Sequence, residues 1–350
     1  MILPCGTRNF TYAEDMAILR TKTHWALFIG FLVLLFTIPL YFNNYWLGVT
    51  NLIGITLIAA IGLNILVGYC GQLSIGHAGF IAVGAFTAAV LTNRLELPFM
   101  IGLICAGLVA GMIGLIFGLP SVRVKGFYLA ITTIAAQFII IWVINHWSVT
   151  GGFTGIKVPY ASIAGFEFRS EASQFYLIMG IAALCTFFAK NLARTRVGRA
   201  FIAIRDNDLA AEVMGVNLLY YKLLAFFIGC FLAGIAGALL AHWVGFMNAE
   251  QFSLKESILY IGMIIIGGLG TTLGPIFGVV VIRLLEQVLT VMVAPWLEST
   301  FTVLPAGFAT GVTPMLFGLI IILFLILEPR GLAHRWALFK SAYRLWPFSY

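Results

Sequence analysis

Runs of about 20 apolar residues constrain the fold of this chain more than any other feature. An apolar run of that length crosses the hydrocarbon core of a bilayer when it forms a helix. The mean hydropathy is +1.04, and only 9% of the 350 residues are charged. We therefore predict an all-α polytopic membrane protein with about ten transmembrane helices and glycine-rich broken segments.

The predicted spans are separated by connections of unequal length. They are residues 24–42, 47–67, 73–92, 98–118, 127–147, 174–193, 221–246, 256–270, 274–293 and 308–327. The chain is thus divided into a cytoplasmic N-terminal segment 1–23, a transmembrane domain 24–327 and a C-terminal tail 328–350. The tail mixes aromatic residues with cations, which suits a segment lying against membrane lipid.

The positions of Lys and Arg predict the orientation. If the N-terminus is cytoplasmic, 15 of the 20 Lys and Arg residues lie on the inside, four lie on the outside and Arg283 lies in a span. Membrane proteins keep their excess of cations in cytoplasmic connections. Both termini are therefore predicted to be cytoplasmic, and the net charge of +7 calls for no nucleic-acid partner.

The sequence lacks the motifs of an enzyme. It contains neither a G-x-x-x-x-G-K-[ST] phosphate loop nor an H-E-x-x-H zinc motif. The five cysteines are scattered and form no C-x-x-C pair, which argues against a disulfide framework or a metal site. We predict a non-catalytic subunit with no cofactor.

A glycine-rich passage at residues 68–86 places polar side chains beside helix-weakening glycines. Non-helical backbone at membrane depth persists only where it is buried or lines a cavity. The passage is therefore either a broken helix on a substrate path or a cytoplasmic turn between two spans. In the fifth span, Thr133 and Gln137 share a helical face and line the path or, the favoured alternative, make interhelical hydrogen bonds. The candidates for the path are Gln72, Ser74, Gly76, His77, Thr133 and Gln137.

Two charges lie inside the ninth predicted span. Arg283 and Glu286 are three residues apart, so they can pair on one face of a helix. Charges at membrane depth are costly and point to a functional role. A position near the outer end of the span is the alternative, and both stay open at this stage.

A charged island, Thr195–Gly215, interrupts the apolar runs within a cytoplasmic segment 194–220. We predict a short helix from about Asp208 to Met214, with Asp206 or Asn207 as its N-cap and Gly215 at its end. Its small apolar face would consist of Ala210, Ala211 and Met214. The helix is interpreted as a docking element for a cytoplasmic protein, and a solvated loop is the alternative.

Seven passages taken together resemble one family. They are GQLSIGHAGFIAVGAF, VRVKGFYLAITTIA, TGGFTGI, TRVGRAFIAIRDNDLAAEVMGV, KLLAFFIGCFLAGIAGALLA, SILYIGMIIIGGLGTTLGPIFG and EPRGL. In this order they are similar to the permease subunits of high-affinity branched-chain amino acid ABC transporters of the LivM type. The resemblance runs from about residue 61 to residue 332.

The resemblance implies a bacterial inner-membrane permease with partners. These are a second, LivH-like permease, two cytoplasmic ATP-binding subunits and a periplasmic amino-acid-binding protein. The island would couple the permease to an ATPase where other importers carry E-A-A-x-x-x-G, although Leu209 replaces the acid here. The implied coupling residues are Arg199, Arg205, Asp206, Asn207, Ala210, Ala211 and Gly215.

The substrate implied by the resemblance is leucine, isoleucine or valine. Permeases for urea and short-chain amides have similar glycine-rich passages and are the first alternative. A secondary transporter that works without ATP is a second and weaker alternative, because it would need ionisable residues at mid-membrane to couple ions.

Overall fold

A computed structural model of the chain describes residues 22–122, 124, 126–163, 165–293, 295–296 and 308–345. The predicted N-terminal segment 1–23 therefore lies almost entirely outside the described residues. The chain divides into two compact units, Met1–Gly48 and Val49–Tyr350, which are described separately. The first contains α2 (Lys22–Tyr41) and the beginning of α3 (Asn44–Leu63), which continues into the second.

The second unit is built from helices. α3 is followed by a π-helix, η1 (Asn64–Tyr69). The α-helices that come next in the chain are α4 (His77–Arg94), α5 (Phe99–Gly118), α6 (Phe127–His146), α7 (Glu171–Arg194), α8 (Arg196–Asp206), α9 (Asp208–Val213), α10 (Leu218–Val244), α11 (Leu254–Gly267), α12 (Gly274–Val288), α14 (Phe308–Leu327) and α15 (Leu332–Leu345). A second π-helix, η6 (Leu289–Val293), extends α12. Short 3-10 turns occupy η2 (Leu119–Val122), η3 (Ser148–Thr150), η4 (Gly152–Thr154) and η5 (Ala249–Gln251).

Each of the ten predicted spans overlaps a helix, but the helices differ in length. Among the described residues, six are long and apolar enough to cross a membrane, or seven if α14 and α15, bent by 43°, count as one span. The 14 residues of α11 reach only about 21 Å, short of the roughly 30 Å of a bilayer core. The protein is an all-helical, multi-pass membrane protein, and the count of about ten is not confirmed.

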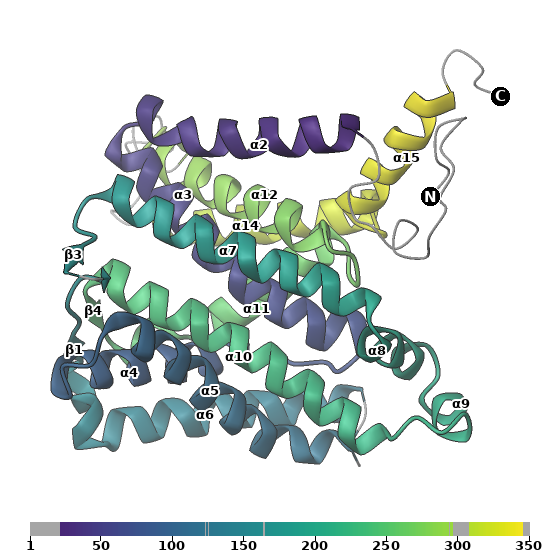
Figure 1. The fold of residues 1–350 in the computed structure, drawn as a ribbon, viewed down its shortest axis with the longest axis horizontal. Coiled ribbons are helices and arrows are strands. Elements are labelled where there is room, and N and C mark those ends of the chain that lie inside the picture. Colours follow the sequence, from purple (N-terminus) through teal and green to yellow (C-terminus); the bar gives the residue numbers. More distant parts are fainter. Residues whose placement is uncertain are drawn as a thin grey trace. The chain divides into compact units, whose positions relative to one another are not determined.

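α10 lies at the centre of the second unit and packs most extensively on α5 and α4 (Figure 1). Glycines allow this close approach. A Cβ added at Gly84 would lie 2.3 Å from Gly234 Cα, and one added at Gly237 would lie 2.0 Å from the Ile81 carbonyl oxygen. In lipid, the hydrophobic effect does not drive helices together. The van der Waals contacts made at such a close approach therefore supply much of the packing energy.

Both glycine-rich passages interrupt helices. After η1 the chain runs without helical structure through residues 70–76, where Gln72, Ser74 and Gly76 are buried, and α4 begins at His77. The second passage ends α11 at Gly267, turns through residues 268–273 and starts α12 at Gly274. We call these segments the first break (70–76) and the second break (268–273).

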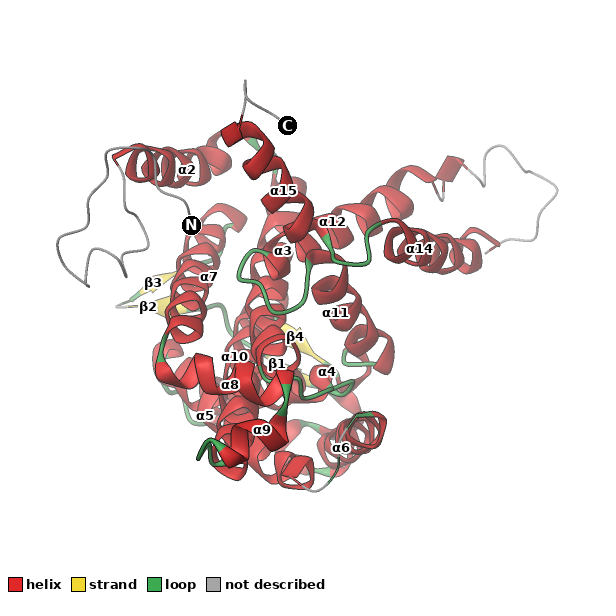
Figure 2. Ribbon diagram, turned by 90° about the vertical axis from the view of Figure 1, so that its right-hand side faces the viewer, coloured by secondary structure: helices red, strands yellow, loops and turns green. Residues whose placement is uncertain are grey.

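Short β-ladders occur at the end of the bundle away from α8 and α9 (Figures 1 and 2). β1 (Ile156–Lys157) pairs antiparallel with β4 (Phe246–Met247). β2 (Ser162–Ile163) pairs antiparallel with β3 (Phe166–Glu167). The first ladder ties the loop that follows α6 to the end of α10.

Candidate functional site

The charged island folds into two short helices, α8 and α9, which we call the elbow (residues 195–217). The Thr195 hydroxyl caps α8 by accepting a hydrogen bond from the Gly198 amide at 3.4 Å. α8 buries Phe201 and Ile204 on one side. Sequence reasoning missed this helix, although Val197 and the apolar residues after it recur at the three- and four-residue spacing of an amphipathic helix.

The predicted helix after α8 is confirmed. α9 spans Asp208–Val213, and the Asn207 side chain caps it by accepting a hydrogen bond from the Ala210 amide at 3.1 Å. Gly215 ends it with a φ of +86°, a left-handed conformation that glycine adopts without steric cost. The N-cap is therefore Asn207, one of the two residues predicted for it.

The predicted apolar face of α9 needs one correction. Ala211 is buried and packs within the hydrophobic core of the chain, so it is not available to a partner. The exposed apolar side chains are Leu209, Val213 and Met214, of which Val213 is 87% exposed. These three residues, together with exposed Ala210, form the surface that we call the α9 face.

Arg205, near the end of α8, fastens the elbow to the end of η1, just before the first break. Its Nη1 donates a hydrogen bond to the Gly68 carbonyl oxygen at 2.9 Å. The last carbonyls of a helix lack intrahelical partners, and a cation is favourable at that end of the helix dipole. Asp206 Oδ1 lies 3.0 Å from Arg205 Nη2 and holds the guanidinium from the other side. Arg205 thus caps the helix formed by α3 and η1.

The second break also contacts η1 and Arg205. Asn64 of η1 donates a hydrogen bond to the Thr271 carbonyl oxygen at 2.9 Å and accepts one from the Gly270 amide at 3.0 Å. A Cβ added at Gly270 would lie 2.5 Å from Arg205 Nη1. Arg205 of the elbow therefore lies against both the end of η1 and the second break, while Asn64 ties η1 to the second break.

A buried ion pair connects the elbow to α10. Lys222 is 1% exposed, and its Nζ lies 3.6 Å from Asp208 Oδ2. Burial raises the pKa of the neighbouring Cys70 thiol to about 12, although the charge of Lys222 opposes that shift. Cys70 is therefore a neutral thiol at neutral pH, and Asp208 provides the balancing negative charge.

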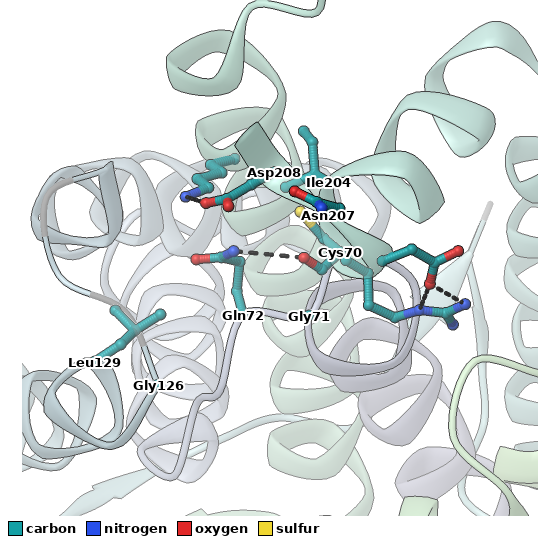
Figure 3. A pocket seen from close by; sticks show the side chains of 11 residues that line it. Cys70, Gly71, Gln72, Gly126, Leu129, Ile204, Asn207 and Asp208 are labelled. Carbon is teal, nitrogen blue, oxygen red and sulfur yellow. Dashed lines mark hydrogen bonds and ion pairs between the residues drawn. The ribbon is translucent and has the colours of Figure 1, made fainter. Parts of the chain in front are cut away.

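A cavity of about 340 Å³ lies between the elbow, the first break and the start of α6 (Figure 3). Gln72 projects into it, and its Nε2 donates a hydrogen bond to the Cys70 carbonyl oxygen at 3.4 Å. Leu129 and Gly126 contribute the α6 side. The site thus combines a helix with an exposed apolar face, a buried cation and a polar hollow.

The other path candidates make contacts between helices. The Thr133 hydroxyl accepts a hydrogen bond from the Ile75 amide at 3.0 Å. Gln137 donates to the Phe252 carbonyl oxygen at 3.0 Å and accepts from the Ser257 hydroxyl at 2.8 Å. A Cβ added at Gly76 would lie 1.9 Å from the Thr133 carbonyl oxygen. These contacts fit the alternative of interhelical hydrogen bonding in this conformation.

Ser74 and His77 complete that set. His77 Nε2 lies 3.0 Å from the Ala59 carbonyl oxygen. The Ser74 hydroxyl and the other ring nitrogen of His77, Nδ1, are buried without a hydrogen-bond partner. Of the six path candidates, Gln72 is the one that lines the cavity beside the elbow.

Comparison with known proteins places the chain among permeases. The chain is 31% identical over 279 residues to the high-affinity branched-chain amino acid transport system permease protein LivM of Escherichia coli, covering 73% of this chain and 66% of that protein. It is 32% identical over 253 residues to the protein of the same name from Salmonella typhimurium, covering 65% and 60%. It thus spans under two thirds of the length of these two relatives.

A more distant relative is covered more completely. The chain is 24% identical over 319 residues to the probable branched-chain amino acid transport permease protein LivM of Methanocaldococcus jannaschii, covering 80% of this chain and 90% of that protein. No solved structure matches the chain. The family model described as branched-chain amino acid transport system / permease component matches residues 45–327. This match includes the elbow, both breaks and α10, and the chain therefore belongs to that family.

Proposed function

We propose that this chain is a LivM-type permease subunit of an ABC importer for leucine, isoleucine and valine. It forms the translocation path with a second, LivH-like permease. Two cytoplasmic ATP-binding subunits drive it, and a periplasmic amino-acid-binding protein delivers the substrate. The proposal rests on membership of the permease family and on the names of the relatives.

The observation that carries the mechanism is the anchoring of the elbow. The α9 face is exposed, while Asp208 on the same helix pairs with buried Lys222 and Arg205 caps η1. The elbow thus presents apolar side chains to the outside, while its contacts with the rest of the chain hold it in place. Such an arrangement is suited to transmit the movement of a docked partner. ATP binding in that partner would move the elbow, and the elbow would move α10 and the two breaks.

The coupling residues divide into two groups within this proposal. Arg205, Asp206 and Asn207 hold the shape of the elbow, and Ala211 packs it against the chain. Arg199 and Ala210 form the second group and are exposed. Gly215 ends α9, and the chain then continues to α10. Gln72 is placed on the inner end of the substrate path, where it lines the cavity.

Localisation in the bacterial inner membrane, with both termini cytoplasmic, is part of the proposal. The membrane location rests on the apolar helices and on the permease family, and the orientation rests on the bias of Lys and Arg to one side of the chain. The elbow then lies in the cytoplasm, and the ladder of β1 and β4 lies on the outer side.

Uptake of labelled leucine and urea, in cells with and without this gene, tests the function. We expect concentrative leucine uptake to disappear with the gene and to require the ATP-binding subunits, while urea uptake stays unchanged. Loss of urea uptake would favour the urea and amide permeases instead. Leucine uptake that persists without the ATP-binding subunits would favour a secondary transporter.

A cysteine at position 213 tests both docking and orientation. We expect Val213→Cys to react with a membrane-impermeant maleimide in inside-out vesicles but not in intact cells, because the side chain is 87% exposed on the cytoplasmic side. We also expect it to crosslink to the ATP-binding subunit. Phe166→Cys, exposed on β3 at the other end of the bundle, is the matched control and should react only from outside. Reaction of Val213→Cys in intact cells would reverse the orientation, and failure to crosslink would remove the docking role.

A further inference from the structure

Two cations are buried within the described residues, Lys222 and Arg283. Lys222, on α10, pairs with Asp208 of the elbow. Arg283, on α12, lines a second pocket of about 230 Å³ formed by α3, α4, α10, α11 and α12. Trp243 also lines this pocket. It lies near the other end of α10, about 30 Å along that helix from Lys222. The second pocket therefore lies away from the elbow, toward the outer side of the bundle under the proposed orientation.

Arg283 is held rigidly on one side. Its Nη1 donates to Glu286 Oε2 at 2.8 Å, which confirms the predicted pairing of these residues along one helix face. Its Nε donates to the Thr56 hydroxyl at 3.2 Å. These two contacts fix the plane of the guanidinium. They leave Nη2 as the nitrogen directed toward Glu256 of α11.

The contact between Arg283 and Glu256 is weak. Glu256 Oε2 lies 3.5 Å from Arg283 Nη2, well beyond the roughly 2.7–2.9 Å of a strong charge-assisted hydrogen bond. Both side chains line the pocket. A ligand that offers a carboxylate to Nη2 and a cation to Glu256 would replace one long contact with two short ones. It would leave the pairs of Arg283 with Glu286 and Thr56 intact.

Most of the remaining lining suits a small apolar group. Ile55, Ile81 and Leu240 form an aliphatic wall, and Phe252 and Trp243 add aromatic surface. A cavity of about 150 Å³ holds a benzene molecule. A pocket of about 230 Å³ therefore has room for roughly half as many atoms again, which is the size of free leucine or isoleucine.

We propose that this pocket binds one free branched-chain amino acid during transport. Arg283 Nη2 receives the α-carboxylate, Glu256 receives the α-ammonium, and the aliphatic wall receives the side chain. The proposal rests on the proposed function and deepens it, because it gives the permease its own recognition of the zwitterion. A zwitterion adds no net charge to a pocket that already contains one cation and one anion.

Binding of labelled leucine to the purified complex of both permeases and both ATP-binding subunits, without the binding protein, tests the site. We expect saturable binding that unlabelled leucine, isoleucine and valine displace. Isopentylamine, which is leucine without its carboxylate, should compete at least tenfold more weakly. So should 4-methylpentanoate, which is leucine without its ammonium group. Equal competition by either analogue would overturn the proposed recognition.

Two conservative variants assign the two charges. In Glu256→Gln, leucine should bind no better than 4-methylpentanoate, because the Glu256 carboxylate that would pair with the leucine ammonium is gone. In Arg283→Lys, leucine should lose at least tenfold in affinity and most of its advantage over isopentylamine. Lys255→Gln changes an exposed neighbour of Glu256 that does not line the pocket, and it should bind like the wild type. A merely structural role would lower the melting temperature of the complex without changing the ranking of the three ligands.

The outcomes separate this proposal from the proposed function. If the wild-type complex with binding protein and ATP transports no leucine, the proposed function fails and this site fails with it. If transport is normal but both variants keep the wild-type ranking of leucine over its analogues, only the pocket proposal is overturned.

Discussion

Arg205→Ala is expected to reduce leucine uptake at least tenfold while the ATP-binding subunits stay bound. The substitution removes the hydrogen bond to Gly68 and the ion pair with Asp206, but it leaves the α9 face in place. A hydrogen bond to a charged group contributes about 1.5–3 kcal/mol, and about 1.4 kcal/mol corresponds to a factor of ten. We therefore expect the substitution to break the connection from the elbow to the two breaks while the ATP-binding subunits still dock.

Uptake in vesicles, together with co-purification of the ATP-binding subunits, measures this separation. Arg196→Ala is the matched control, because it removes the same charge from the exposed start of α8. Arg205→Lys should recover part of the activity, since an ammonium can still donate to a single carbonyl. Normal uptake by Arg205→Ala would show that the contact with Gly68 transmits nothing.

Two glycine substitutions are expected to differ in their effect on stability. Gly237→Ala places a Cβ 2.0 Å from the Ile81 carbonyl oxygen of α4. Backbone atoms cannot rotate away as side chains can, so the loss should reach the upper part of the roughly 1–3 kcal/mol range of overpacking. Gly180→Ala on α7 has no neighbour within 4 Å and should gain up to about 1 kcal/mol from helix propensity.

Thermal unfolding of the detergent-solubilised complex checks the pair. We expect a lower melting temperature for Gly237→Ala and an unchanged or higher one for Gly180→Ala. Because both changes add one methyl group to a helical glycine, the comparison isolates the close approach of α10 to α4. Equal shifts for the two variants would contradict the packing described for this interface.

Local features of the chain were predictable from the sequence. Apolar runs located the long apolar helices but not α8. Asn207 and Gly215 marked the limits of α9, because capping depends on neighbouring residues alone. The helix pairing of Arg283 with Glu286 was predictable for the same reason. The family was recognisable from seven short passages in order, and the family model matches residues 45–327.

Contacts between distant segments were not predictable in this way. Nothing near Arg205 in sequence indicates Gly68 as its partner, and nothing near Arg283 indicates Glu256. Lys222 reads as one more cytoplasmic cation until the fold buries it against Asp208. The glycines were visible in the sequence, but the backbone that each one approaches depends on how the helices cross.

The continuity of α10 has a mechanical consequence. This helix of 27 residues contains no proline. Lys222 in its first turns pairs with Asp208, and Trp243 near its other end lines the second pocket. Between these ends, Gly234 and Gly237 hold it against its neighbours. Under the proposed function, we expect such a helix to act as a lever with its fulcrum at the glycines. A push on the elbow in one direction would then displace the wall of the second pocket in the opposite direction, so that one tilt would close one end as it opens the other.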